Sequence, residues 1–426
     1  MKFNIENAPH IVVFMRPFAH LILGLIISYC LAVVMLVDED SVALGEPNLQ
    51  SAEFNLDKIV DGLSRPTGLT FLGPDDFLVI EEDTGKVKRV VDGEISQTML
   101  DLDVSTDNSR GLIGIDSYQN GSKTFVFLYY TESTSSRDGE GDPLGNRLYR
   151  YELSDDKNSL INPKLLLDLP AGPGSMDNGG PVLVGPDKYI YLVVGQIQDD
   201  DGVGHQTKAQ NFEEGVDADG TSGVHRVTQD GKVVATGILD PAAEKSGYFA
   251  YGIRNSFGMD FDPITGKLWL SENGVHTNDE INLVESGFNG GWKDVTGLAP
   301  SSFDYSGLVS FKGTGKYSDP KFVWNHTVAP TALLFFNSNS FGPDYKNDIF
   351  VGDYAFGRIY HFELDSERTG LRLNGTLSDK VANSDSELQS TIFGEGFGVP
   401  TDIEIGPDGL LYVSSLRDGA VYKVTR

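Results

Sequence analysis

The chain is nearly free of cysteine. Among its 426 residues only Cys30 carries a thiol, and it lies inside an apolar run. The rest of the chain can therefore form neither a disulfide framework nor a thiolate metal site. A metal bound there would need oxygen or imidazole ligands, and such ligands suit calcium better than zinc in so acidic a chain.

Basic residues are also scarce. The chain has 33 lysines and arginines against 62 aspartates and glutamates, which gives a formal net charge of −29. Nucleic acids and anionic membrane surfaces are bound through basic faces, so this balance argues against both as partners. The sequence shows no dinucleotide fingerprint, phosphate-cradling glycine loop or Ser-His-Asp order, and NAD chemistry is therefore not expected.

Long apolar runs are absent apart from residues 18–37, which are long enough to cross a bilayer. Lys2 and Arg16 precede this run and residues 38–40 are acidic, so the positive-inside rule places residues 1–17 in the cytoplasm. We therefore predict a single-pass anchor in the cell membrane, with the rest of the chain on the extracytoplasmic side. A cleaved signal and a secreted protein is the alternative.

After an acidic linker at residues 38–52, the chain repeats itself to its end. Residues 66–90 (Pro-Thr-Gly-Leu-Thr-Phe and onward) have a near copy in residues 400–424. Four looser copies lie between them and begin near Gly111, Gly179, Gly258 and Thr331. Six such units of short alternating strands predict an all-β fold, a six-bladed β-propeller over residues 53–426, preceded by one N-terminal transmembrane helix. Residues 54–59 are expected to pair with the last blade and close the ring.

The loops that lead into the predicted blades carry polar side chains. Residues 177–180 (Asp-Asn-Gly-Gly) enter the third blade, and Arg254 and Asn255 enter the fourth. Thr331 and Thr401 stand at the corresponding points of the fifth and sixth. A propeller gathers such loops around one central channel, so we expect these residues to form a site there.

A second group of candidates follows the strand predicted at residues 268–271. Gly274 opens a loop whose carbonyls could turn toward an ion, and the Asp279-Glu280 pair could balance the charge of that ion. A solvated acidic turn is the alternative for this pair. For Arg254 the alternative to ligand binding is a buried ion pair with a carboxylate such as Glu272.

Together these motifs resemble the glucose/sorbosone dehydrogenase family, the soluble aldose dehydrogenases that use pyrroloquinoline quinone (PQQ) and calcium. The resemblance runs from about Pro66 to the C-terminus. It implies oxidation of a sugar's anomeric hydroxyl to a lactone, with the electrons passed to an external acceptor. It also implies that PQQ is bound by residues that the motifs place around the channel, namely Arg254, Asn255, Thr331 and Thr401.

The resemblance further implies two calcium sites. The carbonyls of Gly274 and Val275 would hold the calcium under PQQ, although the family has a proline at the second position. Glu280 would hold a second, structural calcium together with a carbonyl near Gly290. Other family side chains are replaced here: glutamines by Ser109 and Phe257, and paired arginines by Thr401 and Ile403.

The histidine that serves as the base in the family is Asp177 in this chain. An ordinary aspartate is a weaker base than imidazole near neutrality unless its surroundings raise its pKa. Asp177 could be the base, a ligand of a cation or sugar, or a structural turn residue. Two other functions follow from these alternatives: a non-catalytic propeller that binds a carbohydrate or protein, and a calcium-dependent lactonase that gathers Asp177, Asn178, Glu272 and Asn273 around one ion.

Overall fold

The structure is a computed structural model that describes residues 46–136, 141–172, 174–198, 205–234 and 247–426. Residues 46–426 form one compact unit. The predicted cytoplasmic segment 1–17 and anchor 18–37 lie outside the described residues. Within the described ranges, no helix has the length and apolar character needed to cross a membrane.

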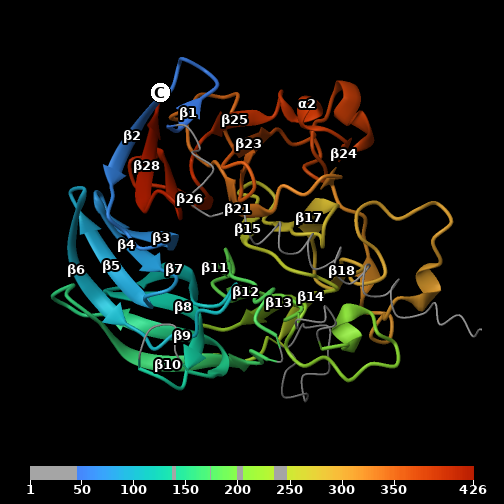
Figure 1. The fold of residues 1–426 in the computed structure, drawn as a ribbon, viewed down its shortest axis with the longest axis horizontal. Helices are drawn as coiled ribbons and strands as arrows, with labels where there is room; N and C mark the ends of the chain where they lie inside the picture. The colour runs from blue at the N-terminus through green and yellow to red at the C-terminus, as the bar shows by residue number, and fades with distance from the viewer. Residues whose placement is uncertain (1–45, 137–140, 173, 199–204, 235–246) are drawn as a thin grey trace, which may run out of the picture. The chain divides into compact units, whose positions relative to one another are not determined.

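The described residues form six sheets arranged around a common centre (Figure 1). The inner strands neighbour one another in a closed circuit, and they are β3 (Pro66–Gly73), β7 (Leu112–Asn120), β11 (Val182–Val184), β15 (Gly258–Phe261), β21 (Pro330–Phe335) and β26 (Pro400–Ile405). Each begins one of the repeats found in the sequence. The predicted all-β propeller is therefore confirmed.

The remaining strands follow outward in each sheet. The first sheet continues with β4 (Asp76–Glu81), β5 (Lys86–Val91) and β6 (Glu94–Asp101). The second continues with β8 (Lys123–Ser133), β9 (Pro143–Leu153) and β10 (Leu160–Leu169). The third continues with β12 (Ile190–Val194), β13 (Gly223–Val227), β14 (Tyr248–Tyr251), β18 (Phe288–Asn289), β19 (Lys316–Tyr317). The fourth continues with β16 (Leu268–Glu272), β17 (Asp279–Val284), β20 (Phe322–Trp324), β24 (Val381–Ala382). Helical segments are short: η1 (Lys208–Gln210), η2 (Tyr305–Gly307), η3 (Gly375–Asp379), α2 (Asp385–Leu388).

The last two sheets are completed by strands from the beginning of the described chain. The fifth contains β22 (Ile349–Asp353), β23 (Ile359–Phe362), β25 (Ile392–Glu395) and β1 (Asn48–Leu49), and the sixth contains β27 (Leu411–Ser415), β28 (Ala420–Thr425) and β2 (Asn55–Val60). The pairing of β2 with β28 confirms the predicted closure by the segment before the first repeat. β1 pairs with β25 although it lies in the predicted linker, so ordered pairing begins before residue 53.

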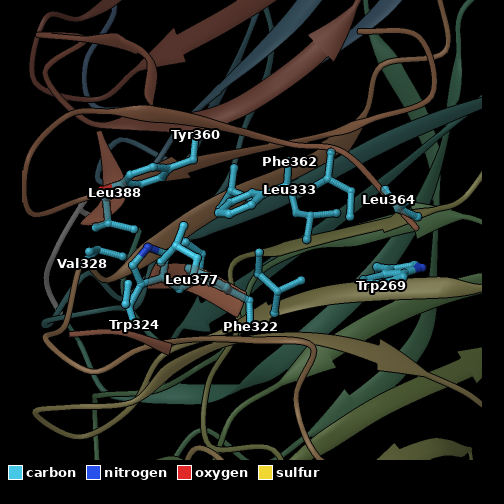
Figure 2. Close-up of a cluster of buried hydrophobic side chains, with 14 of the residues drawn as sticks. Trp269, Phe322, Trp324, Val328, Leu333, Tyr360, Phe362, Leu364, Leu377 and Leu388 are labelled. Carbon is cyan, nitrogen blue, oxygen red and sulfur yellow. The ribbon is translucent and has the colours of Figure 1, made fainter. Parts of the chain in front are cut away.

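Large apolar side chains fill the space between neighbouring sheets. Figure 2 shows the cluster between the fourth and fifth sheets, where Phe322 and Trp324 of β20 meet Tyr360 and Phe362 of β23. The ring centroids of Phe322 and Trp324 lie 4.9 Å apart in an edge-to-face arrangement, and those of Phe322 and Phe362 lie 5.0 Å apart. Aromatic pairs of this kind add to the burial of apolar area and fix one packing arrangement. The sheets are therefore held firmly against one another.

Three inner-strand aspartates connect neighbouring sheets by hydrogen bonds. Asp116, Asp260 and Asp402 each accept a backbone N–H from the next sheet at 2.7 Å, and the donors are Val184, Phe335 and Leu69. The three aspartates line a cavity of about 150 Å³ enclosed by all six inner strands. Removal from bulk solvent raises the pKa of Asp116 to about 6 and the pKa of both Asp260 and Asp402 to about 7.

These aspartates predict a pH-dependent stability. The folded-state pKa of Asp260, about 7, lies above its ordinary value of 3.8, so the folded state binds the proton more tightly. The stabilisation is complete below pH 3.8 and is lost as the pH rises through 7. Between pH 5 and pH 8, we expect the melting temperature of Asp260→Asn to fall less than that of the wild type. The difference should be roughly 2 °C for each 1 kcal/mol of unfolding free energy that the wild type loses through Asp260. Asp101→Asn, an exposed control at the end of β6, should follow the wild type; equal slopes in all three proteins would contradict the assignment.

Candidate active site

The loop into the third sheet has a tightly specified backbone. Asp177 adopts a left-handed conformation with φ of 60°, and Gly179 has φ of 80° with its Cα so close to β12 that a Cβ would lie 2.2 Å from the carbonyl oxygen of Val193. Asn178 donates its amide to the carbonyl of Ser175 at 2.7 Å and accepts from Asn146 at 2.9 Å. These contacts fix the direction in which the Asp177 side chain leaves the loop.

Asp177 and Arg254 form a buried ion pair between the third and fourth sheets. Arg254 Nη2 lies 2.9 Å from Asp177 Oδ2, and the two residues are 7% and 5% exposed. Burial raises the pKa of Asp177, while the charge of Arg254 and a hydrogen bond from Gln196 act in the opposite direction. The partner of Arg254 is therefore Asp177 rather than Glu272. Glu272 instead accepts the backbone N–H of Arg254 at 2.6 Å.

Arg254 also contacts Gln198, to whose Oε1 its Nη2 donates at 3.3 Å, and the loop after β16. Nη1 donates to the carbonyl oxygens of Asn273 and Gly274, both at 3.1 Å. The guanidinium carbon lies 5.8 Å from the ring centroid of Trp292, within range of a cation–π interaction. Trp292 is anchored in turn, since its indole N–H donates to Gln196 Oε1 at 2.9 Å. The arginine thus joins the third and fourth sheets to the segment that contains Trp292.

Asn255 completes the link between the two loops. Its Oδ1 accepts the backbone N–H of Gly179 at 3.0 Å, and the residue is 3% exposed. The structure therefore brings Asp177, Arg254 and Asn255 together, as the positions of their loops in the repeats predict. Gln196 and Trp292 were not assigned a role from the sequence. Trp292 follows a pair of glycines after β18, whereas Gln196 follows β12 with no motif around it.

Thr331 and Thr401 are placed differently from the other predicted ligands. The hydroxyl of Thr331 donates to the carbonyl of Pro400 in the sixth sheet, and the hydroxyl of Thr401 donates to the carbonyl of Pro66 in the first at 2.7 Å. Both hydroxyl hydrogens are thus used between neighbouring sheets. In this structure the two threonines connect sheets, and cofactor binding by them stays a prediction.

Two buried glutamates face each other across β16 and β17. Glu272 and Glu280 are directly opposite in the register, and they are 6% and 5% exposed. Asn282 Nδ2 donates to Glu280 Oε2 at 2.8 Å and to Glu272 Oε2 at 3.3 Å, and Gly297 N–H donates to Glu280 Oε1 at 2.6 Å. Burial raises the pKa of Glu280 to about 7. Burial, followed by the charge of Glu280, raises the pKa of Glu272 above its usual range.

The predicted metal ligands around Gly274 are partly engaged. Its carbonyl accepts from Arg254, and its N–H donates to Asp279 Oδ1 at 2.8 Å. Val275 follows with a side chain that is 43% exposed. Gly290 lies just after β18 and donates its N–H to the carbonyl of Tyr251 at 3.0 Å. Arg254 occupies one lone pair of the Gly274 carbonyl oxygen, and calcium ligation would use the other.

The arrangement needed for the lactonase alternative is not found in the part of the chain that the structure describes. That part contains no group of three or more histidine, cysteine, aspartate or glutamate side chains able to hold one metal ion. Asp177 pairs with the guanidinium of Arg254, whereas Glu272 accepts the backbone N–H of the same residue. Asn178 is turned toward Ser175 and Asn146. Asp177, Asn178 and Glu272 therefore have separate partners, and the described residues offer no hydrogen-bond partner to the buried Asn273 Oδ1.

Comparison with known proteins gives a consistent result. The Glucose / Sorbosone dehydrogenase family matches residues 63–423. The aldose sugar dehydrogenase of Escherichia coli (strain K12) is 25% identical over 385 residues, which cover 88% of this chain and 93% of that protein. Quinoprotein glucose dehydrogenase B of Acinetobacter calcoaceticus is 28% identical over 271 residues, covering 59% of this chain and 55% of that one.

Solved structures agree on the fold. The PQQ-bound aldose sugar dehydrogenase of Streptomyces coelicolor superposes with a TM-score of 0.61 at 21% identity, and the match covers 88% of this chain and 99% of that one. At this level of identity, the likeness supports the propeller fold alone.

Proposed function

Because the chain belongs to the glucose/sorbosone dehydrogenase family, we propose that it is a PQQ-dependent aldose sugar dehydrogenase built on a six-bladed propeller. It would oxidise the anomeric hydroxyl of a sugar to the lactone and pass the electrons to an external acceptor. The observation that carries the proposal is the buried Asp177–Arg254 ion pair, held by the loops that enter the third and fourth sheets. In this pair the carboxylate proposed as the base lies beside a buried cation.

The residues present fit an anionic quinone such as PQQ. Arg254 supplies a buried cation, and its Nε has no hydrogen-bond partner within the described residues. Asn255 uses its carbonyl oxygen to accept from Gly179, which leaves its amide N–H groups available to a ligand. Bound PQQ would supply an acceptor for the hydride of the anomeric C–H. Arg254 and Asn255 would hold it through charge-assisted and amide hydrogen bonds.

The part played by the chain's own residues is proton removal. Asp177 is ionised while Arg254 and Gln196 donate to it, and its burial makes it a stronger base than an exposed aspartate. The substrate hydroxyl would give its proton to this carboxylate as the adjacent C–H bond breaks, with the hydrogen leaving as hydride. The sugar is left as a lactone, so protons and electrons balance.

Substitution of Asp177 tests this role. We expect Asp177→Asn to lower kcat for PQQ-dependent sugar oxidation by about 10²- to 10⁴-fold, the range of general-base catalysis, while PQQ still binds. Asp177→His should keep measurable activity, because imidazole is the base in the glucose/sorbosone dehydrogenase family. Steady-state kinetics and quinone absorbance would measure the two properties. A wild type that neither binds PQQ nor oxidises any aldose would make the channel a binding surface instead.

We also propose that calcium accompanies the cofactor, with Gly274 and Val275 at the cofactor and Glu280 at a structural site near Gly290. The observation that supports the structural site is the buried Glu272–Glu280 pair, two carboxyl groups directly opposite each other in the register of β16 and β17. A divalent cation would relieve their repulsion and let both ionise.

Metal removal tests the structural site. A cation that binds only the folded state, and whose free concentration is about 100 times its Kd, adds about 2.7 kcal/mol to the free energy of unfolding. A calcium chelator should therefore lower the melting temperature of the wild type and change that of Glu280→Gln little. Glu285→Gln, an exposed control just after β17, should respond as the wild type does. Equal chelator shifts in all three proteins would remove Glu280 from any calcium site.

For location, we propose that residues 18–37 anchor the protein in the cell membrane, with the propeller on the extracytoplasmic side. The proposal rests on the length of that apolar run and on the charges that flank it. Protease added to intact cells should then digest the propeller, and the full-length protein should sediment with membranes. A propeller protected until the cells are lysed would contradict this orientation, and a soluble form beginning after residue 37 would indicate a cleaved signal.

A further inference from the structure

The Gln196 side chain has all its hydrogen-bonding groups committed. Its Nε2 donates to Asp177 Oδ2 and to Gln198 Oε1, both at 2.8 Å, and its Oε1 accepts from the indole N–H of Trp292 at 2.9 Å. Gln196 is 3% exposed. An indole N–H can only donate, so the amide oxygen faces Trp292 and the amide N–H₂ faces Asp177. Trp292 thereby settles the orientation of the amide.

This orientation favours one protonation state of Asp177. An N–H group that donates to a carboxyl oxygen stabilises the charged carboxylate more than the neutral acid. Arg254 Nη2 approaches the same Oδ2 at 2.9 Å, so both donors act on one oxygen. For Asp177 Oδ1, the described residues provide no hydrogen-bond partner, and this oxygen is not among their buried unpaired polar atoms. Oδ1 is therefore the oxygen open to an incoming hydroxyl.

We propose that Gln196, oriented by Trp292, is a positioning residue that keeps Asp177 ionised and leaves Oδ1 to receive the substrate proton. The role of Oδ1 toward the substrate rests on the proposed function, whereas the ionised state of Asp177 follows from its contacts alone. Within the described residues the charged group that touches Asp177 is Arg254, with Glu272 behind it at the backbone N–H of Arg254.

The ionisation of Asp177 can be measured without sugar or cofactor. Infrared difference titration of the full-length protein reports carboxyl protonation, and Asp177→Asn identifies the band that belongs to Asp177. A hydrogen bond to a charged group stabilises it enough that Gln196→Met should raise the pKa of Asp177 by about one unit or more. Trp292→Phe should raise it less, because Gln196 keeps its amide donor and loses only the indole contact that orients it. Gln119→Met, the same substitution at an exposed glutamine near the end of β7, should leave the pKa of Asp177 unchanged.

Gln196→Glu provides a second variant if Gln196→Met does not fold. It keeps the size of the side chain but replaces the donor by a second carboxyl, so the pair should hold one proton to higher pH than the wild-type site. A folded Gln196 variant in which Asp177 titrates as in the wild type would overturn the proposal.

Kinetics with PQQ and a sugar separate this inference from the proposed function. The acidic limb of the pH profile of kcat/KM should move to higher pH in Gln196→Met by the same interval as the infrared titration, with KM above that limb changed little. If the titration shifts but the wild type oxidises no aldose, the dehydrogenase function fails and the control of ionisation remains. If activity is present but its pH profile does not follow Asp177, Gln196 does not position the base.

Discussion

The ion pair between Asp177 and Arg254 is the interaction on which the site depends. Two charges taken from water into a protein interior lose several kcal/mol of hydration each, and their attraction offsets this loss when further hydrogen bonds satisfy both groups. Gln196 supplies one such bond to Asp177, and the carbonyls of Asn273 and Gly274 supply two to Arg254. Removal of either partner would leave a buried, uncompensated charge. The pair therefore binds the loop that enters the third sheet to the loop that enters the fourth.

The scaffold keeps these loops in place by two kinds of contact. Apolar clusters such as the one around Trp324 and Phe322 fill the space between sheets and supply most of the favourable burial. The inner-strand aspartates and the threonine hydroxyls add directional bonds from one sheet to the next. Close packing resists small displacements, so a loop anchored at both ends on such sheets holds its side chains in a narrow range of positions.

The repeats in the sequence predict the sheets, the closure by β2 and the loops that carry Asp177, Arg254 and Asn255, because each repeat contains its own strands and turns. The side-chain partners could not be predicted in the same way. Whether Arg254 pairs with Asp177 or Glu272 depends on how neighbouring sheets are turned in the ring, which local sequence does not encode. Gln196 lies in no motif, and the opposition of Glu272 and Glu280 follows from the strand register. The inner-strand aspartates were visible as acidic residues in apolar strands, but their partners lie one sheet away.

Under the proposed function, an aspartate in place of a histidine base changes the charge that the site carries before and after proton transfer. A neutral imidazole becomes a cation when it takes up a proton, whereas Asp177 starts as an anion paired with Arg254 and becomes neutral. Under the proposed function, a hydride carries negative charge to its acceptor in the same step, so the acceptor gains the charge that Asp177 loses. An arginine that binds both groups keeps a counter-ion before and after the step. Arg254 would then pair with Asp177 before the step and with the acceptor after it, and Gln196 would set how readily Asp177 takes up the proton.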